Sequence, residues 1–390
     1  MATVLPAGNT RSVLHSTPFP LVLKSGSGAS VTSLDGREYT DFVSDYSAGL
    51  YGHSHPVITK AVAEALATGF SLGGVTEKEA QLGEILCNRF QSIEQVRFCN
   101  SGTEANTYAL GTALAFNGRK KVLVFESGYH GGTLNFAPAT VNSLNLPHDF
   151  VIGAYNDIES TRSLADERIG AILVEPMQSA GGMRPSSKEF LQFPRETATR
   201  VGAVLIFDEV VTSRFHFHGM QGAWGVRPDM TTLGKYLGGG FPFGAFGGRA
   251  DIMNQFDPEE AGAQCLQHAG TFNNNIFTMT SAVAAADLVT EEALVRLNQL
   301  GNRVREQGNK MAQRAGFGGI SFTGYGSAIG VHFHGSEESV LLHAFYFYLL
   351  RHGITIGRRG FISLNLQHTD AHVDHLIRAI RGFINEYGSL

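Results

Sequence analysis

Two glycine-containing turns of the chain have the composition of a site for a flat, phosphorylated ligand. The sequence NSGTEAN at residues 100–106 enters a helical pattern, and the free backbone N–H groups at such a turn suit a phosphate. The sequence GYHGG at residues 128–132 holds an aromatic ring and an imidazole among glycines, which let a flat ring approach the main chain. Taken alone, the first turn also fits an ordinary helix cap and the second a packed loop.

Charged residues in two further segments add acid and amine chemistry. Asp208 and Glu209 follow the apolar run at 203–207, where a buried carboxylate is costly unless a cation faces it. Lys235 lies in the neutral, glycine-rich stretch 232–240, and a desolvated lysine can form an imine with an aldehyde. By itself, such a lysine is also typical of a solvated loop.

Together these segments supply the parts of a pyridoxal phosphate site: a phosphate cradle, a stacking aromatic, an acid for the ring nitrogen and an imine-forming lysine. The chain resembles the class III aminotransferases of the pyridoxal-phosphate fold type I, from about Gly8 to its C-terminus. The resemblance rests on motifs in the family's order and spacing: SGTEAN at 101–106, YHGG at 129–132, DEV at 208–210, LGK at 233–235 and GTFN at 270–273.

The resemblance implies a role for each cofactor-binding residue. Lys235 would form the Schiff base with pyridoxal 5'-phosphate and move the proton, and Asp208 would pair with the pyridinium nitrogen. Tyr129 would stack on one face of the ring and Val210 would pack on the other, with His130 in the same cofactor-binding set. The phosphate would be held by Ser101, Gly102, Thr103 and, from a neighbouring subunit, Thr271. The resemblance therefore implies a homodimer with shared active sites.

One position departs from the family pattern. Many relatives carry glutamine three residues after the aspartate for the ring nitrogen, where it bonds to the phenolic oxygen of the cofactor. This chain has Val211 at that place. Which residue takes over the contact, or whether the contact is missing, stays open.

Two arginines carry the expectation about the substrate. Several segments are similar to those of β-phenylalanine aminotransferases, namely residues 9–14, 18–21, 47–54, 270–275 and 359–361. By this resemblance Arg11 would bind the carboxylate of a β-amino acid and Arg359 the α-carboxylate of the keto-acid acceptor, a task suited to a planar guanidinium fork. The expected reaction moves the amino group of an aromatic β-amino acid to 2-oxoglutarate or pyruvate. The alternative for Arg11 is a solvent-facing residue near a frayed terminus.

Other activities remain as alternatives. Glutamate-1-semialdehyde 2,1-aminomutases have similar surroundings at 233–235 and 244–249, but they keep the amino group on the same skeleton. An amine:keto-acid transaminase for amines without a carboxylate would leave both arginines as spectators. A non-catalytic protein that binds pyridoxal phosphate is disfavoured, because Lys235 and Asp208 are both present.

Weaker motifs point to no other cofactor. The glycines at 324–330 are one residue off the dinucleotide fingerprint and lack its long βαβ context. His368, His372 and His375 lie at roughly helical spacing, and the acidic residues between them predict a solvated face instead of a metal site. We therefore expect no metal.

Composition limits the classes of partner and the location. The net charge is -5 and no basic run is long, which argues against nucleic-acid binding. No apolar stretch reaches the roughly 18 residues of a membrane span, and the first residues do not resemble a signal peptide. The three cysteines are too few and too scattered for a disulfide framework. These features predict a soluble cytoplasmic enzyme whose partners are a small amino donor and a keto acid.

The elements that must position these residues follow an α/β pattern. Apolar runs predict buried strands at 95–99, 121–126, 150–155, 171–175 and 203–207, alternating with helices around a mostly parallel sheet. We assign residues 46–296 to a large cofactor-binding α/β domain, and 1–45 with 297–390 to a smaller α+β lobe. The lobe should contain a hairpin turning at Asp35-Gly36.

Two helices are predicted with specific details. A helix from Pro56 to Gly69 places Ile58, Val62 and Leu66 on one apolar face. In the helical pattern at 188–201, a proline in the interior would cost about 3 kcal/mol. We therefore expect that helix to be kinked at Pro194 or to begin there.

Overall fold

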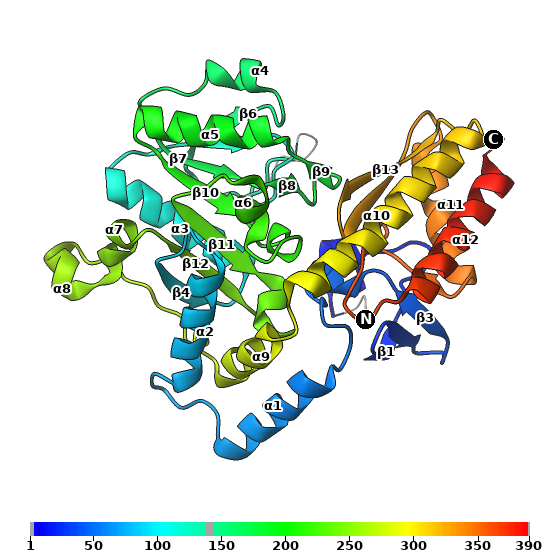
Figure 1. Ribbon diagram of the computed structural model, residues 1–390, viewed down its shortest axis with the longest axis horizontal. Helices are drawn as coiled ribbons and strands as arrows, with labels where there is room; N and C mark the ends of the chain where they lie inside the picture. Colours follow the sequence, from blue (N-terminus) through cyan, green and yellow to red (C-terminus); the bar gives the residue numbers. More distant parts are fainter. Residues whose placement is uncertain (1–3, 138–142, 389–390) are drawn as a thin grey trace. The chain divides into compact units, whose positions relative to one another are not determined.

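The chain divides into two compact units in the computed structural model, which describes residues 4–137 and 143–388 (Figure 1). One unit is Pro56–Val295, and the other combines Met1–His55 with Arg296–Leu390. The second of these divisions falls inside the long helix α10 (Glu291–Arg314). Residues 1–3 and 389–390, at the ends of the lobe assigned from the sequence, lie outside the described residues.

A seven-stranded sheet forms the centre of the unit Pro56–Val295. Its order is β4-β12-β11-β10-β7-β5-β6, and the pairs from β11 to β6 are all parallel, whereas β12 is antiparallel to both of its neighbours. The predicted mostly parallel α/β core is confirmed. The strands are β4 (Gln95–Cys99), β5 (Lys121–Phe125), β6 (Asp149–Gly153), β7 (Ile169–Val174), β10 (Val204–Asp208), β11 (Met230–Gly234) and β12 (Gly244–Gly248).

The predicted strands of this sheet do not include β11, whose sequence MTTLG is only partly apolar, or β12, whose sequence GAFGG is mostly glycine, a residue that weakens a strand. Close approach of two backbones explains the choice of residue. A Cβ atom at Gly244 would lie 2.1 Å from the carbonyl oxygen of Ser101. The strand therefore packs directly against the turn that precedes helix α3 (Gly102–Asn117).

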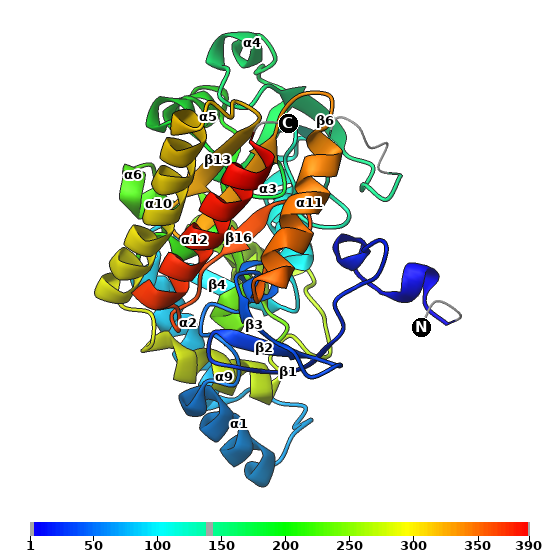
Figure 2. The same cartoon turned by 90° about the vertical axis from the view of Figure 1, so that its right-hand side faces the viewer.

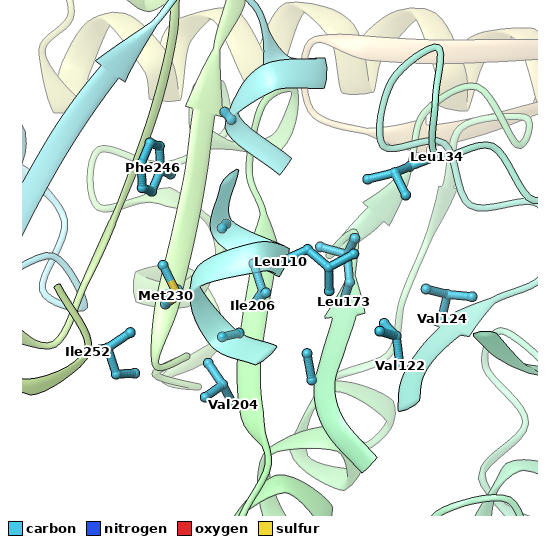
Figure 3. Packing of buried hydrophobic residues seen from close by; sticks show 14 of the residues in the cluster. Leu110, Val122, Val124, Leu134, Leu173, Val204, Ile206, Met230, Phe246 and Ile252 are labelled. Carbon is cyan, nitrogen blue, oxygen red and sulfur yellow. The ribbon is translucent and has the colours of Figure 1, made fainter. Parts of the chain in front are cut away.

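Helices cover both faces of this sheet, because successive side chains of a strand point to opposite sides. Figure 3 shows the core on the α3 side, where Leu110 packs near Leu173 and Ile206. Leu123 belongs to the other core, to which α5 (Lys188–Val201) contributes Phe190. Helix α5 is capped by Ser187 and contains Pro194 in its interior, so the expectation that it begins at the proline is wrong.

Two helices of this unit, α1 (Pro56–Thr68) and α2 (Glu77–Arg89), each pack on α9 (Ile276–Ala286). Helix α1 begins at Pro56 as predicted. The predicted apolar face of α1 is wrong at one position, since Leu66 is 56% exposed while Ile58 is buried. The shorter helices are α4 (Ile158–Arg162), α6 (Gly219–Trp224), α7 (Ala250–Met253) and α8 (Pro258–Ala261), and a small hairpin is formed by β8 (Met177–Gln178) and β9 (Arg184–Pro185).

The other unit joins both ends of the chain. Strands β1 (Leu23–Ser27), β2 (Ser30–Ser33) and β3 (Glu38–Asp41) form an antiparallel sheet that β15 (Ile354–Thr355) extends in parallel. The predicted hairpin is confirmed as β2 and β3. A second, antiparallel sheet contains β13 (Ile320–Tyr325), β14 (Ala328–Phe333) and β16 (Phe361–Ser363). Helices α10, α11 (Glu338–Arg351) and α12 (Asp370–Tyr387) lie side by side in this unit (Figure 2).

The structure of this unit shows where two of the weaker sequence motifs lie. Gly324 and Gly326 lie at the turn of the β13–β14 hairpin, so no phosphate-binding strand–helix turn is present there. His368 is fully buried, with its ring centroid 4.4 Å from that of Phe42, so a solvated face is the wrong description for it. Across residues 4–137 and 143–388, no helix has both the length and the apolar character needed to span a membrane.

Candidate active site

The turn at residues 100–106 forms the N-terminal end of α3. The Ser101 hydroxyl accepts a hydrogen bond from the Glu104 N–H at 3.2 Å, and the Glu104 carboxylate accepts one from the Asn100 N–H at 2.7 Å. The N–H groups of Gly102 and Thr103 belong to the first turn, where a helix supplies no acceptor. The turn is therefore both a helix cap and a positive helix end with donors for an anion.

Small residues bring the other motifs close to this turn. A Cβ atom at Gly102 would lie 3.0 Å from Cγ1 of Val210, so glycine lets the Val210 side chain pack against the backbone of this turn. Gly131 has a φ of +118°, and a Cβ atom there would lie 2.4 Å from Oγ1 of Thr103. The same oxygen accepts a hydrogen bond from the Gly132 N–H at 3.2 Å. Three segments that are distant in sequence thus meet at the end of α3.

Asp208 ends strand β10 and is 5% exposed. Its Oδ2 atom lies 2.8 Å from Nδ1 of His130 and accepts a hydrogen bond from Nδ2 of Asn106 at 2.9 Å. Its Oδ1 atom accepts from the Val210 N–H at 3.1 Å. The carboxylate is held in one orientation, as an acid facing a ring nitrogen must be.

Asn106 is the last residue of the SGTEAN motif, and the sequence by itself predicts no role for it. Its side chain donates to the His130 carbonyl at 3.1 Å and to Asp208, and its oxygen accepts from the Thr232 hydroxyl at 2.7 Å. It therefore ties α3, β10, β11 and the GYHGG loop together. Its position one turn into the helix after the GTE sequence is the only signal that the sequence offered.

Glu175 is a site residue that was not predicted from the sequence. It follows β7, and its Oε2 accepts a hydrogen bond from the Tyr129 N–H at 3.0 Å, while Oε1 accepts from the N–H and hydroxyl of Ser179 at 3.0 Å each. Burial raises the pKa of Glu175 to about 7; His130 opposes this shift and Asp208 adds to it. The signal was available, because Glu175 ends an apolar run just as Asp208 does.

The neighbouring acid of the DEV motif has a structural role. Glu209 is fully buried and accepts hydrogen bonds from the N–H groups of Met220 at 2.7 Å and Gln221 at 3.0 Å, so it caps helix α6. Burial raises the pKa of Glu209. Only Asp208 of the pair joins the cluster with His130.

Lys235 directly follows β11 and has a φ of +54°, a left-handed conformation that non-glycine residues seldom adopt. Its neighbour Tyr236 is fully buried and anchors the turn: the Tyr236 hydroxyl donates to the Ser213 carbonyl at 2.9 Å and accepts from Arg89 at 2.8 Å. Residues in such strained conformations cluster at functional sites, where the surrounding contacts hold them in place. Because β10 and β11 are parallel neighbours, Asp208 and Lys235 lie at the same edge of the sheet.

The remaining cofactor residues have different degrees of exposure. Tyr129 lies in the GYHGG loop and is 42% exposed, so its ring is accessible to a ligand. Val211 is buried. Thr271 is exposed on a turn, and the nearby Asn273 accepts a hydrogen bond from Asn100 at 2.9 Å, which places the GTFN tract beside the cradle of the same chain.

Both candidate substrate arginines belong to the other unit, where Arg11 contacts Tyr46 and Arg359 is two residues from Phe361, whose ring packs 5.3 Å from that of Tyr46. Nη1 of Arg11 lies 2.6 Å from Oδ1 of Asp45, and its Cζ atom is 5.2 Å from the centre of the Tyr46 ring. Burial raises the pKa of Tyr46, while the positive charges of Arg11 and Arg359 act to lower it. Arg359 is exposed. The structure thus brings together two arginines that are far apart in sequence.

The donor set of the unit Pro56–Val295 fits pyridoxal phosphate. Among the residues that the structure describes, His130 is the only basic side chain paired with the buried Asp208, so the carboxylate suits a protonated ring nitrogen. The open end of α3 suits the phosphate, and Lys235 at the same sheet edge suits the aldehyde.

Comparisons with known proteins agree with this chemistry. A family model described as aminotransferase class-III matches residues 12–384. The chain is 45% identical to a β-phenylalanine transaminase of Variovorax paradoxus, over all of this chain and 92% of that protein. A solved β-phenylalanine aminotransferase from Variovorax paradoxus superposes with a TM-score of 0.96 at 44% identity, covering all of this chain and 93% of that one. A glutamate-1-semialdehyde 2,1-aminomutase of Bacillus pumilus is 33% identical, with 93% and 90% covered.

Proposed function

The chain belongs to the class III aminotransferases, and we propose that it transfers the amino group of an aromatic β-amino acid, such as β-phenylalanine, to 2-oxoglutarate or pyruvate. The family depends on pyridoxal phosphate and has the fold type I architecture. The observation that carries the choice of donor is the 45% identity to a β-phenylalanine transaminase along the whole chain. The contact of Arg11 with Tyr46, and of Tyr46 with Phe361 beside Arg359, supports it.

We propose the following roles for the cofactor-binding residues. Pyridoxal phosphate supplies an aldehyde that can carry an amino group and a ring that accepts electrons. Ser101, Gly102 and Thr103 bind its phosphate at the end of α3, and Tyr129 and Val210 enclose its ring. Asp208, held by His130 and Asn106, keeps a proton on the ring nitrogen. The Nζ atom of Lys235 holds the cofactor and moves the proton of the substrate carbon.

The two arginines would divide the carboxylates between them. Arg11 binds the carboxylate of the β-amino acid, and Arg359 binds the α-carboxylate of the keto acid. A guanidinium–carboxylate pair gains from two parallel hydrogen bonds, which an amine without a carboxylate does not form. The donor class is therefore decided by residues that play no part in the proton transfer.

Two alternatives lose support. The aminomutase relative is less similar than the β-phenylalanine transaminase, at 33% against 45% identity. An amine transaminase that acts on substrates without a carboxylate would have no ligand for Arg11, which Asp45 and Tyr46 hold.

We further propose a homodimer in which Thr271 completes the partner's phosphate site. The loop after α1 and the GTFNNN tract lie side by side, since Nδ2 of Asn274 donates to the Gly74 carbonyl at 3.1 Å. The two segments expose apolar side chains, with exposed fractions of 60% for Phe70, 59% for Leu72, 94% for Val75 and 60% for Phe272. A second copy would cover this patch, which we call the loop patch.

We propose that the enzyme works in the cytoplasm. The cysteines Cys87, Cys99 and Cys265 are all free thiols, as a reducing compartment would keep them. Separation of a tagged producing cell into cytoplasmic and exported fractions, followed by detection of the protein in each, tests the assignment.

A donor comparison tests the proposed function. Single-turnover rates with β-phenylalanine, glutamate semialdehyde and 1-phenylethylamine should rank β-phenylalanine first. Arg11→Ala should weaken the use of β-phenylalanine by about 3 kcal/mol at most and spare 1-phenylethylamine, whereas Arg359→Ala should impair the keto-acid half-reaction. An equal loss for both donors in Arg11→Ala would refute the role of Arg11.

A further inference from the structure

The segment Ser44–Ser47 has a backbone conformation that is rare for residues other than glycine. Its four residues have φ angles of +45°, +43°, +53° and +77°, so together they form one left-handed turn. None of them is glycine. Side chains at left-handed positions are strained, and a run of four persists only where neighbouring contacts enforce it.

Buried polar contacts enforce this turn from its first residue. Ser44 is fully buried, and its hydroxyl donates to the Ser363 carbonyl and accepts from Nδ2 of Asn365, both at 3.0 Å. The Ser44 N–H donates to Oδ2 of Asp41 at 3.2 Å. The turn is thus fixed between the ends of β3 and β16, in one compact unit.

The turn presents two side chains to Arg11. Oδ1 of Asp45 bonds to Nη1 of Arg11 at 2.6 Å, and the Tyr46 ring lies beneath the guanidinium. The Tyr46 ring is itself packed 5.3 Å from that of Phe361, and its hydroxyl donates to the Val13 carbonyl at 3.3 Å. The strained turn therefore supplies an ion pair and a stacking surface to one arginine.

The way in which Asp45 holds Arg11 leaves room for a substrate. Within the described part of the chain, the single hydrogen bond of the Arg11 guanidinium is the one from Nη1 to Asp45. A guanidinium has five N–H donors in a planar fork, so Nη2 and Nε can still bind a second carboxylate. A flexible arginine loses rotamer freedom when it binds, and an arginine that is already ordered loses less.

We propose that Asp45 and Tyr46 are positioning residues for Arg11: the left-handed turn orders the guanidinium so that its remaining donors meet the carboxylate of the amino donor. This inference rests on the proposed function, because it requires Arg11 to bind that carboxylate. Asp45 and Tyr46 then help to select β-amino acids over plain amines without touching the reacting atoms.

The test compares two donors in one set of variants. Asp45→Asn removes the charge that holds Nη1, so it should raise KM for β-phenylalanine relative to KM for 1-phenylethylamine by about 3- to 10-fold, with kcat unchanged. Asp45→Glu should restore part of the ratio. Asp35→Asn is the matched control, since Asp35 also pairs with an arginine of this unit, at 3.5 Å from Arg37, and is similarly exposed.

The outcomes separate this inference from the proposed function. If Arg11→Ala leaves the donor ratio unchanged, the assigned role of Arg11 fails whatever Asp45 does. If Arg11→Ala changes the ratio and Asp45→Asn does not, the positioning role is overturned. A lower KM for β-phenylalanine in Asp45→Asn also overturns it, because Asp45 would then compete with the substrate. In the Arg11→Ala background, Asp45→Asn should have no further effect on the ratio.

Discussion

The Nδ1 atom of His130 lies 2.8 Å from Oδ2 of Asp208, and both side chains are almost completely buried. One end of this pair is fixed by Asn106 and the other lies close enough to Glu175 for His130 to influence its pKa. The acid that we assign to the ring nitrogen is thus one member of a buried network with several titratable groups.

Asp208→Asn should lower kcat by about 100- to 1000-fold at saturating cofactor, because an amide keeps the shape of the carboxylate but not its charge. Folding stability should change much less, since the amide keeps the size of the carboxylate and its oxygen can still accept one of the two bonds, from the Val210 N–H or from Asn106. Steady-state rates and thermal unfolding of the two proteins check this. Comparable rates would contradict the role of Asp208.

Lys235→Ala should lower turnover by at least about 1000-fold, because the proton transfer loses its acid and base. Pyridoxal phosphate should still bind through the end of α3, so equilibrium dialysis should detect it in the variant. Lys120→Ala, elsewhere in the same unit, is the control and should keep full activity. Undiminished transamination by Lys235→Ala would exclude the assignment.

Glu175 should make stability depend on pH. Its folded pKa of about 7 lies above the ordinary value of 4.5, so the folded protein holds a proton that the unfolded chain has released between these values. Its contribution to stability is full below about pH 4.5 and is lost as the pH rises through about 7. Glu175→Gln carries no such charge. Between about pH 5 and pH 8 the free energy of unfolding of the wild type should fall, relative to that of Glu175→Gln, by on the order of 1–3 kcal/mol.

Denaturant unfolding of the cofactor-free protein at several pH values measures this difference. Glu84→Gln, at an exposed position of α2, serves as the control and should follow the wild type across the range. A constant difference between Glu175→Gln and the wild type at all pH values would show that Glu175 does not titrate there.

The loop patch should hold the homodimer together. Val75 is 94% exposed in the single chain, so Val75→Glu should cost the fold little but place a charge in the dimer interface. Sedimentation should show dissociation, with loss of activity at low concentration. Val340→Glu, at a 62% exposed position of α11, is the control and should remain dimeric. A fully active wild-type monomer would refute the shared site.

The sequence alone was sufficient for the family, the α/β class and most strands and helices. Asp208 and the turn at 100–106 were recognisable because each follows an apolar run, and Lys235 because it is a single lysine in a glycine-rich stretch. The same reasoning did not identify β12, whose glycines are required by the Ser101 backbone that it contacts. It also gave Leu66 a buried position that the fold does not provide.

The tertiary structure decided which of these strand ends act together. Glu175 became a site residue because its carboxylate reaches the Tyr129 N–H from another strand, and Asn106 because it bridges to Asp208 and Thr232. The pairing of Arg11 with Asp45 depends on a left-handed turn of four residues without glycine, a run that local propensity does not predict. Buried contacts from Ser363 and Asn365 impose that conformation on Ser44, and such contacts exist only after distant segments have packed.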